Sequence, residues 1–106
     1  MKKTPLISIV IPTYNHARFL SRALKSVIEQ TYVNWEVIVI DNHSSDNTDE
    51  VMETFIDQRI RYLKIYNNGV IAASRNEGIR AAHGEWIAFL DSDDWWTADK
   101  LMVCVN

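Results

Sequence analysis

The side chains with the clearest chemical potential form a short acidic D-x-D segment, Asp91-Ser92-Asp93, near the end of the chain. Carboxylates two residues apart on an extended strand would point to opposite faces, but on the turn after a strand they can converge on one cation. Carboxylate oxygens combined with phosphate oxygens suit Mg²⁺ or Mn²⁺. The alternative is structural, since acidic residues such as Asp93 and Asp94 also favour the start of a helix. The spacing alone leaves both interpretations open.

Two more groups are candidates for contacts with a nucleotide, and one pair of aromatic residues is a candidate for contacts with a sugar. Asp41 follows a Val- and Ile-rich segment, where a carboxylate can accept hydrogen bonds from a ribose or a base; the same residue can also simply form a turn. Arg75 can pair with a phosphate as a permanently charged, bidentate donor, or it can be a solvated residue on a helix. Trp95-Trp96 can stack on a sugar, or belong to the core or to an interface.

The hydrophobic pattern predicts the elements that position these residues. Continuous apolar runs are typical of strands covered on both faces, and a repeat of about 3.6 residues is typical of helices. We expect Pro12 to end the first strand, Thr48 to cap the second helix and Gly84 to end the third. The expected strands are 6–11, 35–40, 60–66 and 86–90, and the expected helices are 17–30, 48–56, 71–83 and a short segment after Thr97.

This alternation predicts an α/β fold, an open and mostly parallel sheet with helices on both faces, in the order β-α-β-α-β-α-β-α. In such sheets ligands bind beyond the carboxyl ends of the strands. Polar clusters follow three of the expected strands at that end, and they are Thr13-Tyr14-Asn15, Asp41-Asn42-His43 and Asp91-Ser92-Asp93. We therefore expect a single polar site along one edge of the sheet.

Composition and charge exclude several classes of protein. The 106 residues fit one domain, with 47% hydrophobic and 24% charged residues as in ordinary globular chains. A net charge of −3 leaves no electrostatic footprint for nucleic acid, and no apolar run is long enough for a membrane span. The single cysteine, Cys104, excludes an internal disulfide and fits a reducing compartment. The three histidines lack metal-ligand spacing and are interpreted as turn or surface residues.

Five segments form a larger pattern in a fixed order, and they are residues 8–15, 24–32, 35–48, 73–79 and 84–94. Together they resemble the start of a family 2 glycosyltransferase with the GT-A fold. The resemblance implies a transferase in polysaccharide biosynthesis that uses a nucleotide-diphosphate sugar donor and inverts the anomeric carbon. It further implies a carbohydrate or lipid-linked acceptor, and a cytoplasmic enzyme that can be peripheral to the membrane.

The resemblance also assigns roles to individual residues. Asp93, together with Asp91, would hold Mn²⁺ or Mg²⁺, and the ion would neutralise the departing diphosphate. Many family members carry Asp-Asp where this chain has Asp41-Asn42, so the nucleotide base is left open. The residues expected to bind the nucleotide are Pro12, Thr13, Tyr14, Asp41, Asn42, Arg75, Asp91 and Ser92.

Residues 1–106 are therefore expected to form the nucleotide-sugar-binding part, truncated before the acceptor-binding half. That half supplies the catalytic base, which is expected beyond Asn106. We expect this fragment to be inactive in sugar transfer and to self-associate, because little chain remains to cover the apolar residues Trp95, Trp96, Leu101, Met102 and Val103. Three alternatives stay open. They are a non-catalytic nucleotide- or metal-binding module, a fragment completed by another chain, and an α/β interaction domain that binds no phosphate.

Overall fold

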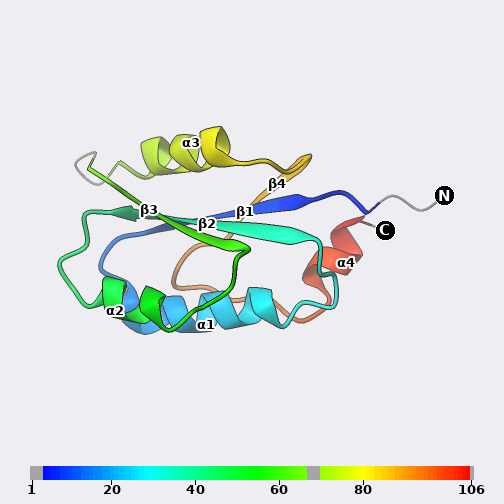
Figure 1. The fold of residues 1–106 in the computed structure, drawn as a ribbon, viewed down its shortest axis with the longest axis horizontal. Coiled ribbons are helices and arrows are strands. Elements are labelled where there is room, and N and C mark those ends of the chain that lie inside the picture. Colours follow the sequence, from blue (N-terminus) through cyan, green and yellow to red (C-terminus); the bar gives the residue numbers. More distant parts are fainter. Residues whose placement is uncertain (1–3, 67–69, 106) are drawn as a thin grey trace.

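The computed structural model describes residues 4–66 and 70–105, and in it a parallel sheet lies between two layers of helices (Figure 1). The sheet order is β3-β2-β1-β4, and every neighbouring pair of strands is parallel. The predicted fold class and order of elements are therefore confirmed. The elements are β1 (Ile7–Thr13), α1 (Ala17–Ile28), β2 (Trp35–Asn42), α2 (Thr48–Glu53), β3 (Ile60–Ile65), α3 (Ile71–Ala81), β4 (Trp86–Phe89) and α4 (Lys100–Val105).

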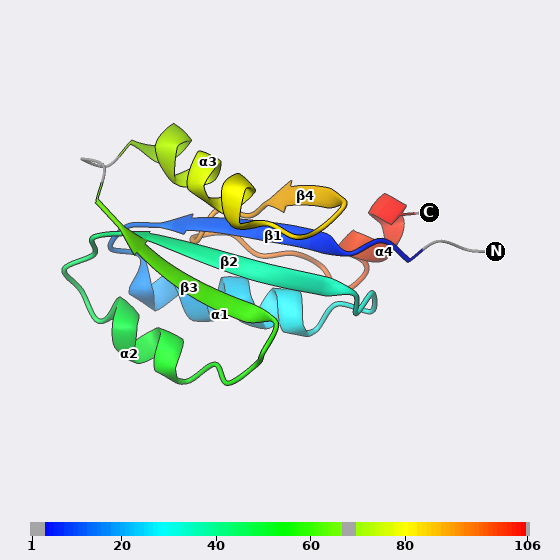
Figure 2. The same ribbon diagram turned by 45° about the horizontal axis from the view of Figure 1, so that its top comes forward.

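The two faces of the sheet carry cores of different size. Helices α1 and α2 cover one face and α3 covers the other (Figures 1 and 2). Because side chains alternate along a strand, Ile9 and Ile11 of β1 join the large core on the α1 side, together with Leu20 and Leu24 of α1. Val10, between them in sequence, belongs instead to a small cluster on the α3 side. The central strand thus connects both layers.

Helix α3 lies close to β1 because residue 78 is a glycine. A Cβ atom at Gly78 would lie 2.3 Å from Val10 Cγ1 and 2.8 Å from Val10 Cγ2. Ser74, one turn earlier on the same helix, is also buried. Small side chains at these two positions allow the helix backbone to approach the sheet.

A polar cluster around Glu36 closes the sheet at the amino ends of its strands. Ser8 Oγ donates a hydrogen bond to Glu36 Oε2 at 2.5 Å, the backbone N–H of His83 donates to the same oxygen at 2.6 Å, and Arg61 donates to Oε1 at 3.2 Å. Burial acts to raise the pKa of Glu36, but these hydrogen bonds and the charge of Arg61 outweigh it and lower the pKa. The cluster ties β1, β2, β3 and the α3–β4 connection together.

Three local predictions are wrong for identifiable reasons. β1 continues through Pro12, because the backbone of proline can be extended and only its missing N–H is lost from the ladder. Helix α3 ends at Ala81, so Gly84 is not its end; a Cβ there would lie 2.5 Å from Ser8 Oγ, which explains the glycine. Thr48 is the first residue of α2 rather than its cap, and its hydroxyl turns back to the preceding loop.

The apolar residues near the end of the chain have mixed environments. Leu101 is buried, whereas Trp95 and Val103 are 51% and 64% exposed. The edge strand β4 also exposes Ile87 and Phe89. Self-association through such surfaces stays a prediction. None of the helices in the described part of the chain has the length and apolar character needed to cross a bilayer.

We predict that Gly78→Ala lowers the free energy of unfolding by about 1–3 kcal/mol, because the new methyl group overpacks against Val10. The cost of overpacking should be larger than the stability that alanine contributes as a better helix former than glycine. Asn76→Ala, at an exposed position of the same helix, should change stability by less than about 0.5 kcal/mol. Urea unfolding followed by circular dichroism measures both variants. Equal stabilities would contradict the close approach of α3 to β1.

The lowered pKa of Glu36 predicts a specific acid sensitivity. A carboxyl whose pKa is lowered by folding stabilises the fold above its unfolded pKa of about 4.3, and this contribution disappears as the pH falls through the lower, folded value. The urea midpoint of the wild type should therefore fall more steeply below about pH 4.3 than that of Glu36→Gln, which carries no titrating group there. Parallel declines in the two proteins would assign the acid sensitivity to other carboxyl groups.

Candidate functional site

The carboxyl ends of the strands border a hollow of about 400 Å³, a volume suited to a small ligand. Its walls come from the ends of β1, β2 and β4 and from α3. All of the predicted site residues except Asp41 line it, together with two that the sequence did not indicate, His16 and Ser74. The lining residues are Pro12, Thr13, Tyr14, His16, Asn42, Ser74, Arg75, Asp91, Ser92 and Asp93.

Two buried polar atoms in the wall of the hollow have no hydrogen-bond partner among the described residues. They are Thr13 Oγ1 and Arg75 Nε. Thr13, at the end of β1, is only 4% exposed. Buried polar groups in proteins are nearly always paired, so an orphaned hydroxyl in a pocket wall is available to a bound molecule.

The acidic segment follows β4 and forms a turn that brings two carboxylates to the hollow. Arg75 Nη2 lies 3.5 Å from Asp91 Oδ1, with both side chains well exposed. The carboxylate of Asp93 is exposed, and within the described residues it takes part in no hydrogen bond or ion pair. Asp94 accepts a bond from its neighbour Trp95 and does not line the hollow. The next helix begins only at Lys100, so the helix-start interpretation of these acids is wrong.

The loops after β1 and β2 are tied to each other at the rim. The backbone N–H of Asn15 donates to Ser44 Oγ at 2.9 Å, and Asn15 Oδ1 accepts from the N–H of Ser45 at 2.8 Å. The N–H of Ala17, at the start of α1, donates to Asp46 Oδ2 at 3.0 Å. Asn15 has a positive φ of 53°, a conformation that asparagine tolerates better than most residues.

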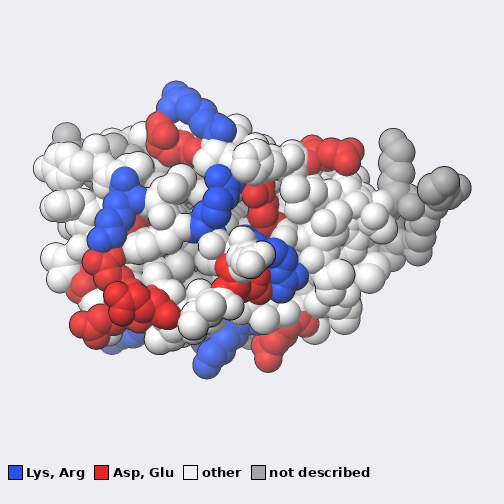
Figure 3. All heavy atoms as spheres, in the orientation of Figure 1, with Lys and Arg blue, Asp and Glu red and all other residues white. Residues whose placement is uncertain are grey.

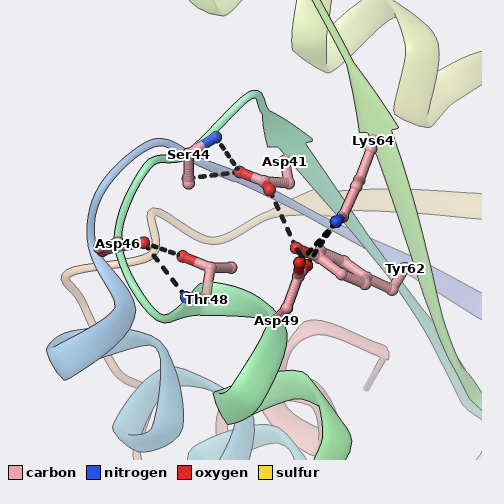
Figure 4. Close-up of polar contacts among 7 residues, drawn as sticks. All are labelled: Asp41, Ser44, Asp46, Thr48, Asp49, Tyr62 and Lys64. Atoms are coloured by element: carbon pink, nitrogen blue, oxygen red, sulfur yellow. Dashed lines mark hydrogen bonds and ion pairs between the residues drawn. The ribbon is translucent and has the colours of Figure 1, made fainter.

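Asp41 belongs to a separate polar network on the α2 side of the sheet (Figure 4). It is 2% exposed and accepts hydrogen bonds from Ser44 and, at 2.9 Å, from the Tyr62 hydroxyl. The same hydroxyl lies 2.8 Å from Asp49, which pairs with Lys64 at 2.6 Å. Burial raises the pKa of the Tyr62 hydroxyl. The carboxylates of Asp49 and Asp41 raise it further, because both accept hydrogen bonds from the neutral hydroxyl and repel its ionised form.

The alternation of side chains along β2 explains this placement. Asp41 follows Val39 to the α1 side of the sheet, whereas Asn42 follows Ile40 to the α3 side. Acidic side chains also gather over α2, at the lower left of Figure 3. Asp41 is therefore part of the polar network beside α2 and not of the hollow.

The network around Asp46 stabilises the rim in a second way. Thr48 donates through both its hydroxyl and its backbone N–H to Asp46 Oδ1 (Figure 4). The other carboxylate oxygen of Asp46 accepts from the Ala17 N–H. Burial acts to raise the pKa of Asp46, but these hydrogen bonds outweigh it and lower the pKa. One carboxylate thus links the starts of α1 and α2.

The two tryptophans after the acidic segment do not line the hollow. They border a second groove, beside α1, together with Arg22 and Lys25. Trp96 packs against the large core, while Trp95 is half exposed. For Trp96 the interpretation as a core residue is therefore confirmed.

None of the described residues is assigned as the catalytic base. The resemblance to family 2 glycosyltransferases predicts that base beyond Asn106, and the described residues reach Val105 in α4. The location of the base therefore stays a prediction.

Residues 8–106 match the family described as Glycosyl transferase family 2. The chain belongs to this family. It is 47% identical over 102 residues to the Escherichia coli UDP-Glc:alpha-D-GlcNAc-diphosphoundecaprenol beta-1,3-glucosyltransferase WfgD, a match that covers 95% of this chain and 40% of that protein. It is 37% identical over 99 residues to the putative teichuronic acid biosynthesis glycosyltransferase TuaG of Bacillus subtilis, covering 92% of this chain and 39% of that protein.

Solved structures agree with the family assignment. The crystal structure of S. aureus TarS in complex with UDP-GlcNAc matches 98% of this chain and 30% of that chain, with 29% identity and a TM-score of 0.86. The mannosyltransferase PcManGT from Pyrobaculum calidifontis, in complex with GDP-Man and Mn²⁺, matches 94% of this chain and 31% of that chain, with 29% identity and a TM-score of 0.83. The present chain spans about 40% of the length of the curated relatives named above.

Proposed function

We propose that the hollow binds the nucleoside diphosphate of a sugar-nucleotide donor, and that a protein built around this domain transfers the sugar to an acceptor hydroxyl with inversion. The observation that carries the proposal is the meeting, in one hollow, of an orphaned buried hydroxyl, an arginine and two exposed carboxylates. Membership of glycosyl transferase family 2 supports it. It also disfavours a phosphate-free interaction domain.

The base and ribose would occupy the part of the hollow formed by the ends of β1 and β2. Tyr14 is 54% exposed there and offers a ring on which a base can stack. The Thr13 hydroxyl offers a hydrogen bond, and Asn42 lines the same part of the hollow with an amide, a group that can both donate and accept and so suits more than one base. The names of similar proteins support UDP- and GDP-linked donors alike. Both nucleotides therefore belong in the test.

The charge of the hollow favours a divalent cation as part of donor binding. Arg75 is the one Lys or Arg among its described lining residues, against the carboxylates of Asp91 and Asp93. A diphosphate would add further negative charge, and a cation between it and Asp93 would remove the repulsion. The donor set fits Mg²⁺ or Mn²⁺, which accept carboxylate and phosphate oxygens. When bound, the ion would act as a Lewis acid that neutralises the departing diphosphate.

Phosphate oxygens and water would complete the coordination of a cation held by the acidic segment. In the part of the chain that the structure describes, no three His, Cys, Asp or Glu side chains converge as a metal site. The long, exposed contact between Arg75 and Asp91 contributes little to stability, so the guanidinium is available for a phosphate. The chain's own residues would thus orient the diphosphate, with Arg75 on one side and the acidic segment on the other.

Residues 1–106 are proposed as the donor-binding part of the transferase. Within them we assign no group as the base that deprotonates the acceptor, and we place that base and the acceptor site beyond Asn106. The names of WfgD and TuaG support a role in polysaccharide synthesis, and the name of WfgD supports a lipid-linked carbohydrate as acceptor. Donor binding is therefore the part of the function that this chain can be tested for directly.

We predict that UDP or GDP binds more tightly with Mn²⁺ than with EDTA, and that Asp93→Asn weakens only the Mn²⁺-dependent binding, by about 1–3 kcal/mol. Asp94→Asn is the matched control, because Asp94 is adjacent but lies outside the hollow. Isothermal titration calorimetry measures all three proteins. Equal affinities in Mn²⁺ and EDTA would exclude the bridging cation, and equal losses in the two variants would exclude the assignment to Asp93.

The Thr13 hydroxyl allows binding to be separated from folding. Since it has no partner in the described structure, Thr13→Val should leave the free energy of unfolding unchanged or slightly higher. Nucleotide affinity should nevertheless fall about three- to tenfold, as for the loss of one hydrogen bond. Thr48→Val, which removes a hydroxyl bonded to Asp46, should instead lower stability by about 1 kcal/mol. Unchanged affinity in Thr13→Val would remove Thr13 from the site.

A further inference from the structure

We propose that His16 is a positioning residue that fixes the acidic segment, residues 91–93, at the hollow. The proposal rests on the proposed function, because it concerns how the carboxylates that meet the donor and its cation are held. Its central observation is a contact of 2.8 Å between His16 Nδ1 and Ser92 Oγ, two residues separated by 76 positions in the sequence. Nothing in the sequence predicted that His16 and Ser92 would be in contact.

His16 is itself held rigidly. It occupies the N-cap position of α1, and its carbonyl accepts hydrogen bonds from the N–H groups of Phe19 at 2.9 Å and Leu20 at 3.0 Å. Its ring meets the ring of Phe19 edge-on, with 6.0 Å between the centroids. The start of α1 thus fixes the backbone of His16, and the neighbouring Phe19 ring restricts the orientation of the imidazole, as a positioning residue requires.

Ser92 is the buried point of the acidic segment. It is 2% exposed, whereas Asp91 and Asp93 on either side are exposed. The segment follows β4, and the last backbone hydrogen bond that joins this part of the chain to β1 runs from the Leu90 N–H to the Val10 carbonyl, at 3.1 Å. Beyond that bond, the Asp94 N–H donates to the Asp91 carbonyl at 2.9 Å and closes the turn. The Ser92 hydroxyl points inward from this turn, so its contact with His16 ties the turn to the start of α1.

The other side-chain contacts of the segment are longer. Arg75 lies 3.5 Å from the Asp91 carboxylate, and Arg22 lies 3.4 Å from the Asp93 carbonyl. In the proposed complex Arg75 turns toward a phosphate and leaves Asp91. The contact between His16 and Ser92 is shorter and does not involve Arg75, so it does not depend on where the Arg75 guanidinium points.

The test compares variants that keep or remove this hydrogen bond. His16→Phe keeps a ring against Phe19 but has no polar atom, whereas His16→Asn places an amide group near the position of Nδ1. We expect His16→Phe to weaken Mn²⁺-dependent UDP or GDP binding about tenfold, and His16→Asn to restore most of the affinity. Binding in EDTA should be the same in all three proteins. His83→Phe, at the opposite edge of the sheet, is the control and should bind like the wild type.

A double-mutant cycle makes the pairing specific. Ser92→Ala should weaken Mn²⁺-dependent binding as much as His16→Phe, and the double variant should be no weaker than either single variant, because both lose the same contact. Additive losses would overturn the proposal, as would His16→Phe binding like the wild type while the wild type shows Mn²⁺-dependent affinity. A wild type without Mn²⁺-dependent affinity would instead overturn the proposed function beneath it. If His16→Phe does not fold, His16→Asn and Ser92→Ala decide the question through the same titrations.

Discussion

The pairing of β1 with a parallel neighbour on each side is the constraint on which the structure depends. β1 aligns with β2 from Ile7 to Thr13 and with β4 from Ile7 to Val10. Parallel neighbours require a crossover each time, so every strand runs in the same direction and the loops after the strands meet at one edge. The polar residues of those loops are neighbours for this reason, although they are distant in sequence.

Edge loops that must face one another need fixed shapes, and here side chains provide them. Asn15 and His43 adopt positive φ angles of 53° and 56°, which carry some backbone strain. The hydrogen bonds of Asn15 to the loop after β2 offset that strain, and Asp46 joins the starts of both following helices. The loops therefore have their shapes before a ligand binds. The conformational entropy lost in ordering them is part of the free energy of folding and does not weaken binding.

Much of the fold was predictable because it follows from local patterns, and parts of the site were predictable because they follow from topology. The apolar runs placed the strands, and parallel pairing placed Thr13, Asn42 and Asp93 around one hollow. The position of Asp41 depends on which face of β2 it occupies, and counting in twos from the buried Val39 gives that face. The burial of Ser92 against His16 depends on the shape of two loops, for which no periodicity exists.

The places where this chain departs from ordinary packing rules distinguish its two edges. At the amino edge, Glu36 and Ser8 satisfy each other and their neighbours while buried. At the carboxyl edge, two of the three orphaned buried polar atoms in the described structure, Thr13 Oγ1 and Arg75 Nε, lie in the wall of the hollow, beside exposed carboxylates. The third is the indole nitrogen of Trp35, at the start of β2 and away from the hollow; the guanidinium of Arg59 stacks over the same ring, with Cζ 3.7 Å from the ring centroid. Groups left unsatisfied by folding are available to a ligand, and this chain concentrates them where the strands end.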